Sequence, residues 1–126
     1  MDNIDPSTYV QQLRNALEEI DGLATHAAQN LIIESGVAER LAPYEGLCGD
    51  GFSWEENGKR HLILGEVVRY AHIFLNEEQL TLARLASSFT DSFEKAPSVA
   101  ELLDELSDEN YALVLEALAA ARPSIA

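Results

Sequence analysis

Apolar residues recur at alternating spacings of three and four between Pro6 and Glu34, a pattern typical of one face of a helix. Asp5 followed by Pro6 is a favourable helix start, because the carboxylate can cap free N–H groups and proline loses no donor at the first helical position. The pattern predicts either a core helix that bends near Asp21–Gly22 or a straight helix that pairs with a second copy. The apolar seam consists of Val10, Leu13, Leu17, Ile20, Ala24, Ala27 and Leu31.

A short β-hairpin is predicted near residues 52–64, because Asn57–Gly58 is a favoured pair for a two-residue turn with positive φ. Pairing outward from this turn sets Glu56 opposite Lys59, Glu55 opposite Arg60, and Trp54 opposite His61. One face of the hairpin would then carry Phe52, Trp54, His61 and Ile63. This face must pack on helices or on a partner, because an isolated hairpin is marginal in water. An irregular loop that exposes Trp54 is the alternative.

Helical spacing returns after Gly65 and continues towards the end of the chain. Asn76 with Gln79, and Ser98 with Glu101, are capping-box pairs that predict two helix starts, and Ser107–Asp108 offers a further cap. We predict a mainly α protein, a helical bundle of four to six helices with one short β-hairpin. The segment that follows Gly65 is apolar nearly all round, which predicts a central helix. Its apolar residues are Val67, Val68, Tyr70, Ala71, Ile73, Phe74 and Leu75.

Composition and charge disfavour several classes of function. The chain has 126 residues, with 22 acidic and 8 basic side chains and a net charge of −14, so we expect a single acidic helical domain over residues 1–126. Such a charge disfavours direct binding to nucleic acid or to anionic membranes, because both depend on Lys and Arg. No run approaches the ~20 apolar residues of a membrane span. The first five residues do not resemble a secretory signal, and Cys48 is the single cysteine. We therefore expect a soluble cytoplasmic protein.

The most regular polar feature is a row of carboxylates at residues 101–109. On one continuous helix they share a face opposite Val99, Leu102, Leu103 and Leu106. With no interleaved lysine these acids repel one another, an arrangement that a basic partner would relieve. We therefore predict that these carboxylates bind a partner, and the predicted partner-binding residues are Glu101, Asp104, Glu105, Asp108, Glu109 and, on the hairpin, Trp54. The alternative is a solubilising surface whose first acids are favoured by the helix N-terminus.

Two short segments resemble enzyme motifs. The acid-x-x-acid pair Glu101 and Asp104 is similar to the magnesium-binding spacing of all-helical nucleotide pyrophosphatases, with Glu18–Glu19 as the opposing pair. That family needs a further inward acid one turn away, where this chain has Gly22 and Leu23. The second resemblance is the segment Arg69 to His72, which is similar to the segment around the phosphorylated histidine of histidine phosphotransfer domains. Those domains continue with Leu-Lys-Gly, whereas Ile73-Phe74-Leu75 follows here.

Cys48 lies in a glycine-rich, anionic loop, which would raise its pKa and favours a passive thiol. We therefore predict no catalytic residue, no cofactor and no metal site, and hence no enzyme.

The sequence favours a small acidic protein-binding module that recognises a basic surface on a partner macromolecule. An inhibitor, an immunity-type protein or a DNA mimic would fit this description, with a nucleic-acid enzyme or a toxin as the partner. The alternative is a structural or chaperone-like subunit that forms a homodimer through the seam at residues 10–31. A histidine phosphotransfer domain or a metal-dependent phosphate enzyme is the remaining alternative.

Overall fold

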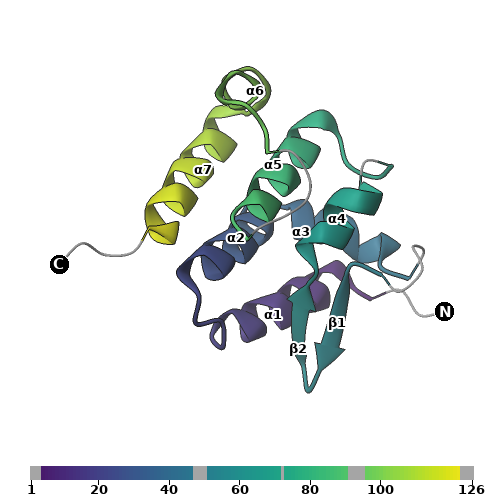
Figure 1. Cartoon of the computed structure of the whole chain (residues 1–126). Coiled ribbons are helices and arrows are strands. Elements are labelled where there is room, and N and C mark those ends of the chain that lie inside the picture. Colours follow the sequence, from purple (N-terminus) through teal and green to yellow (C-terminus); the bar gives the residue numbers. More distant parts are fainter. Residues whose placement is uncertain (1–3, 47–50, 72, 91–95, 123–126) are drawn as a thin grey trace.

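The computed structural model describes residues 4–46, 51–71, 73–90 and 96–122, and over these the protein is mainly α, as predicted (Figure 1). The described residues form seven α-helices, one more than the upper end of the predicted range, and one two-stranded antiparallel sheet. The helices are α1 (Pro6–Leu17), α2 (Leu23–Glu34), α3 (Val37–Leu41), α4 (Leu64–Ala71), α5 (Glu77–Ser88), α6 (Val99–Glu105) and α7 (Asp108–Ala121), with one 3₁₀ turn, η1 (Ala42–Tyr44).

The long helix predicted from Pro6 to Glu34 is two helices. The first ends at Leu17, and Gly22 takes an extended conformation that starts α2, so the bend at Asp21–Gly22 is confirmed. The apolar seam lies inside the protein, with Leu13 and Leu31 nearly inaccessible to solvent. A homodimer through residues 10–31 would therefore lack an exposed apolar row on which to form, since the core already uses this seam. Asp5 caps α1 as predicted, by accepting a hydrogen bond from the backbone N–H of Thr8.

The central helix is α2, which packs against α1, α3, α5 and α7. Its buried side chains point in several directions and include Ala28, Leu31, Ile32 and Ile33. The segment after Gly65 was expected in this central position, but α4 packs mainly on α5. Arg69 on α4 is exposed, and so is Ile73 just beyond it. Sequence periodicity overestimated the burial of this segment because it does not show how many neighbours a helix has.

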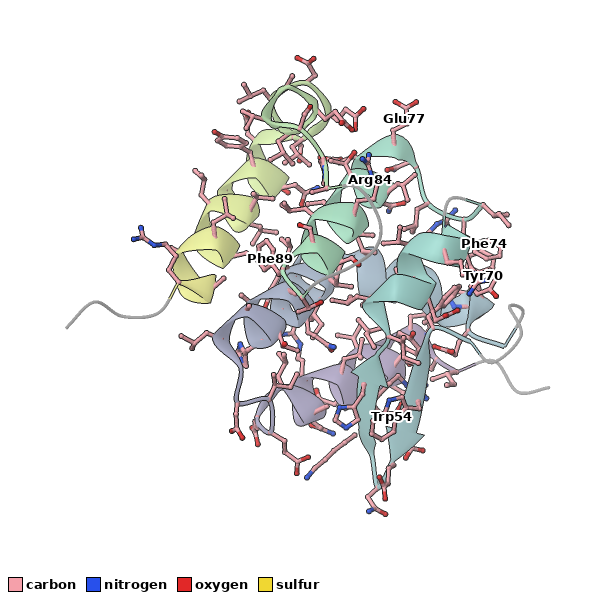
Figure 2. The ribbon with its side chains drawn as sticks, in the orientation of Figure 1. Trp54, Tyr70, Phe74, Glu77, Arg84 and Phe89 are labelled. Carbon is pink, nitrogen blue, oxygen red and sulfur yellow. The ribbon has the colours of Figure 1, made fainter. Side chains whose placement is uncertain are left out.

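The hairpin has the predicted register. Strand β1 (Ser53–Glu56) pairs with β2 (Lys59–Leu62), and Trp54 lies opposite His61. Both turn residues, Asn57 and Gly58, have positive φ. The hairpin packs through β2 on α1, while Trp54 lies on its outward side (Figure 2).

The predicted single aromatic face of the hairpin is wrong for Phe52. This side chain is fully buried, and its ring meets that of Phe74 edge to face at 6.4 Å. Ile63, which was expected on the same face as Phe52, is 42% exposed. Phe52 precedes β1, so its side chain is free to leave the strand alternation and enter the core.

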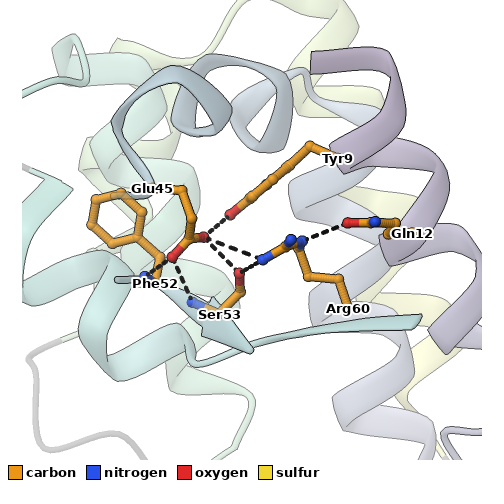
Figure 3. Close-up of polar contacts among 6 residues, drawn as sticks. All are labelled: Tyr9, Gln12, Glu45, Phe52, Ser53 and Arg60. Atoms are coloured by element: carbon orange, nitrogen blue, oxygen red, sulfur yellow. Dashed lines mark hydrogen bonds and ion pairs between the residues drawn. The ribbon is translucent and has the colours of Figure 1, made fainter. Parts of the chain in front are cut away.

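A buried polar cluster fixes the hairpin to the rest of the fold, and the carboxylate of Glu45 is its centre (Figure 3). One oxygen accepts hydrogen bonds from the Tyr9 hydroxyl at 2.6 Å and the Ser53 hydroxyl at 2.5 Å. The other accepts from the backbone N–H of Phe52 at 2.7 Å and, at 3.3 Å, from that of Ser53. Gly51 leaves room for this group, since a Cβ there would lie 1.9 Å from the carboxylate.

The positive member of the cluster is Arg60, whose side chain is only 7% exposed. Its Nη1 donates to the Ser53 hydroxyl at 2.8 Å and lies 3.9 Å from the Glu45 carboxylate. Its Nε donates to Gln12 on α1 at 2.9 Å, and the guanidinium stacks over the Tyr9 ring at 4.8 Å. Burial raises the pKa of the Tyr9 hydroxyl, and its hydrogen bond to Glu45 raises it further. The Tyr9 hydroxyl therefore stays protonated and acts as a hydrogen-bond donor to Glu45.

Replacing Glu45 by Gln should destabilise the protein by roughly 2–4 kcal/mol, because an amide cannot accept from all of these donors and Arg60 loses its buried counter-charge. Urea unfolding followed by circular dichroism measures the change. Glu39→Gln on the exposed surface of α3 is the control and should cost under about 0.5 kcal/mol. Equal stability of the two variants would contradict this role for the cluster.

Candidate functional site

The carboxylates predicted as a partner-binding surface do not lie on one continuous helix. Leu106 has an extended conformation, with φ −89° and ψ 137°, so α6 ends at Glu105. The next helix starts after Ser107, whose side chain caps α7 by accepting from the backbone N–H of Asn110 at 3.2 Å. The cap was visible in the sequence. Because α6 ends at Glu105 and α7 begins at Asp108, the carboxylates of residues 101–109 belong to two helices and do not form one face of a single helix.

Three contacts fasten α6 and its junction with α7 to one side of α5. The Arg84 guanidinium donates to Glu101 at 2.9 Å, and the Thr81 hydroxyl donates to Glu105. Closer to the start of α5, the Glu78 carboxylate accepts from the backbone N–H of Ser107 at 2.5 Å. Two of the five predicted carboxylates, Glu101 and Glu105, are thus partners of α5.

The remaining three predicted carboxylates, Asp104, Asp108 and Glu109, are exposed. Glu77 is also exposed, in the first turn of α5 next to Glu78, which accepts from Ser107 at the α6–α7 junction, and its side chain extends away from the end of α5 (Figure 2). We call these four residues the acidic corner. Glu77 was not among the partner-binding residues predicted from the sequence. The only local signal was its place after the Asn76 cap, and nothing in the sequence places α5 next to α6.

The capping interactions near this corner use charged carboxylates. The backbone N–H of Ser107 lowers the pKa of Glu78. The pKa of Glu101 is lowered by the backbone N–H of Ser98 and, next, by Arg84. Glu101 also completes the predicted capping box, since its own N–H donates to the Ser98 hydroxyl at 3.1 Å. These two groups therefore stabilise the fold most strongly when ionised.

Trp54, the sixth predicted residue, is not part of this surface. It lies on the hairpin, at the end of the molecule opposite α6 (Figures 1 and 2). Its indole is 49% exposed and stacks on the His61 ring, with centroids 4.2 Å apart and planes at 24°. Because the hairpin packs on α1, Trp54 could contact a partner only at a site apart from these carboxylates, and its role in partner binding stays a prediction.

The apolar residues of the last two helices are more exposed than the sequence predicted. Val99 is 71% and Leu103 61% exposed, whereas Leu102 and Leu106 pack against the core. On α7 only Val114 and Ala117 are buried, and this helix packs mainly on α2. The side of α7 that points away from α2 carries exposed Tyr111, Ala112, Leu115, Leu118 and Ala119, which we call the outer face of α7.

The described residues show no arrangement of side chains that supports either enzyme alternative. Among them, no three His, Cys, Asp or Glu side chains are placed to hold a metal ion. Glu19 pairs with Lys59 of the hairpin, while Glu101 pairs with Arg84 on α5, so the two predicted magnesium-binding pairs do not converge. His72 and Cys48 lie outside the described residues. A groove of about 250 Å³ between α2 and α7 is lined in part by His26, Glu34 and Glu116.

Comparison of the chain with known protein families, with curated proteins and with solved structures gave no match. Over the described residues, every helix is too short or too polar to cross a membrane.

Lowering the pH should progressively remove the stabilising effect of Glu78. Because the pKa of this group is below its usual 4.5, its contribution is complete above that value and is lost as the pH falls through the folded-state pKa. The difference in unfolding free energy between the wild type and Glu78→Gln should therefore shrink from about pH 6 to about pH 3. Urea titrations across this range measure it.

Glu77→Gln is the matched control, since Glu77 lies in the same first turn of α5 but is exposed. Its effect should change less with pH than that of Glu78→Gln. An equal pH dependence for both variants would show that the helix terminus, and not the bond to Ser107, is responsible.

Proposed function

We propose that this protein is a binding module that captures a basic surface of a partner macromolecule through the acidic corner. The observation that carries the proposal is that four exposed carboxylates lie at the ends of three helices joined by the Glu78–Ser107 hydrogen bond, in a chain with net charge −14. In this proposal the protein acts by binding and not by catalysis. An inhibitor, a toxin-neutralising protein or a DNA mimic would each use such a surface.

Helix stabilisation accounts for part of the acidic corner but not for all of it. Glu77, Asp108 and Glu109 lie in the first turns of α5 and α7, where the positive end of the helix dipole favours a carboxylate. Asp104 lies in the last turn of α6, where the dipole disfavours a carboxylate, and it is exposed. Placing Asp104 next to other acids costs stability, and a basic partner would offset that cost.

Electrostatics would act at two ranges. The net charge of −14 attracts cationic proteins from a distance and accelerates their encounter. Close to the surface, only charges within about 8 Å interact strongly at physiological salt, so the local carboxylates select the orientation in which the partner docks. The proposal therefore requires that the position of the acids, and not only their number, determines binding.

Charge reversal at the acidic corner tests this requirement. Asp104→Lys with Glu109→Lys should lose the partners that the wild-type protein retains in a pull-down from its native host, since a lysine pair would repel a basic surface. Glu101 and Glu105 are left unchanged because they fasten α6 to α5. Retained proteins should be released as the salt is raised to about 0.5 M.

The matched control is Glu18→Lys with Glu39→Lys, at exposed positions directly after α1 and on α3. Both double variants change the net charge equally, so they differ only in where the charge is reversed. Circular dichroism establishes that both fold. Equal retention of partners by the two variants, or retention that is insensitive to salt, would refute the acidic corner as the binding surface.

A further inference from the structure

The outer face of α7 is an unusual surface for a monomeric protein. Leu115 is 51%, Leu118 42% and Tyr111 37% exposed, and Ala112 and Ala119 between them are exposed as well. Single exposed apolar residues are common, but a continuous apolar face along one helix is typical of a contact surface. In Figure 1, α7 forms an outer edge of the bundle, with α2 on its inner side.

The residues of this face are arranged symmetrically about Leu115. At about 100° per residue, Tyr111 and Leu118 fall on one side of Leu115, and Ala112 and Ala119 fall on the other. A symmetric arrangement of this kind fits an isologous contact, in which one patch binds the same patch of a second copy. An antiparallel pair centred on Leu115 would set Tyr111 beside Leu118 of the second copy. Ala112 would meet Ala119, so the backbones could approach closely on that side.

The charges at the two ends of the face also favour antiparallel pairing. Asp108 is exposed in the first turn of α7, two helical turns before Leu115, and Arg122 is exposed directly after the end of the helix, seven residues after Leu115. An antiparallel pair brings each Asp108 next to Arg122 of the second copy, which gives two ion pairs. A parallel pair would instead place Asp108 against Asp108 and Arg122 against Arg122.

We propose that the outer face of α7 binds a second copy of the chain in an antiparallel, two-fold symmetric dimer centred on Leu115. This interface shares Asp108 with the acidic corner, but its apolar centre at Leu115 lies outside that corner, so substitution of Leu115 tests the dimer independently of the proposed function. Although each copy carries a charge of −14, repulsion between exposed charges is screened beyond about 8 Å at physiological salt. The central contact is apolar, the Asp108–Arg122 contacts are attractive in this orientation, and the exposed Glu116 lies at the edge of the face, about 100° around the helix from Leu115.

Sedimentation equilibrium of the full chain tests the dimer. The wild type should be dimeric at high concentration, and Leu115→Glu should raise the dissociation constant at least about tenfold, because two carboxylates would meet at the two-fold axis. Leu23→Glu, at an equally exposed position on α2, is the control and should leave the dimer intact. A wild type that stays monomeric at about 100 µM, well above micromolar affinity, or a dimer insensitive to Leu115→Glu would overturn the proposal.

Cysteine cross-linking tests the orientation, in a Cys48→Ser background. Leu115→Cys should oxidise to a disulfide-linked dimer, because only a residue on the two-fold axis meets its own copy. Leu118→Cys should not, since antiparallel pairing separates the two copies of residue 118 by about 9 Å along the helix axis, beyond the reach of a disulfide. A parallel dimer would cross-link at both positions, and cross-linking of Leu118→Cys would therefore overturn the antiparallel arrangement.

Discussion

The hydrogen bond from the backbone N–H of Ser107 to the Glu78 carboxylate determines the arrangement of the C-terminal third of the protein. Ser107 is the point at which one helix ends and the next begins, and Glu78 holds this point against the start of α5. Because α6 is then fastened along α5, α7 is directed across α2. The position of the acidic corner follows from this junction, and the outer face of α7 is exposed because only the opposite side of that helix meets α2.

Local signals predicted local structure well. The Asn76 and Ser98 capping boxes, the Ser107 cap and the Asn57–Gly58 turn form as expected, because each depends on residues within a few positions of one another. The hairpin register follows from its turn for the same reason. The class of the fold was therefore accessible from sequence, as was the bend near Gly22.

The environment of each helix was not accessible in this way. Val114 and Leu115 are adjacent apolar residues with similar helical propensity, yet Val114 is buried and Leu115 is half exposed, because only one side of α7 meets α2. Glu101 and Asp104 look equivalent in sequence, but Arg84 pairs with Glu101. Such differences depend on contacts between distant segments, and neither periodicity nor composition contains them. Glu45 is a further example, because no sequence pattern indicates that its carboxylate is buried among hydrogen-bond donors.

The described part of the chain thus contains carboxylates in at least three distinct environments. Glu45 is buried among donors, Glu78 and Glu101 satisfy backbone N–H groups, and the acidic corner is left to solvent. If α7 pairs as proposed, the two acidic corners would be separated by roughly the 20 Å length of that helix. Two such surfaces on one particle could engage a repeated basic partner with an avidity that a single corner lacks.

The stacking of Trp54 on His61 gives the protein a fluorescence signal that reports on the hairpin. Trp54 is the single tryptophan of the chain, it is half exposed, and the ring beside it is an imidazole. Its fluorescence therefore senses hydration and the contact with the His61 ring at the hairpin end of the molecule. Events at α6 and α7 would reach this fluorophore only through the core, so its emission distinguishes detachment of the hairpin from changes at the opposite end.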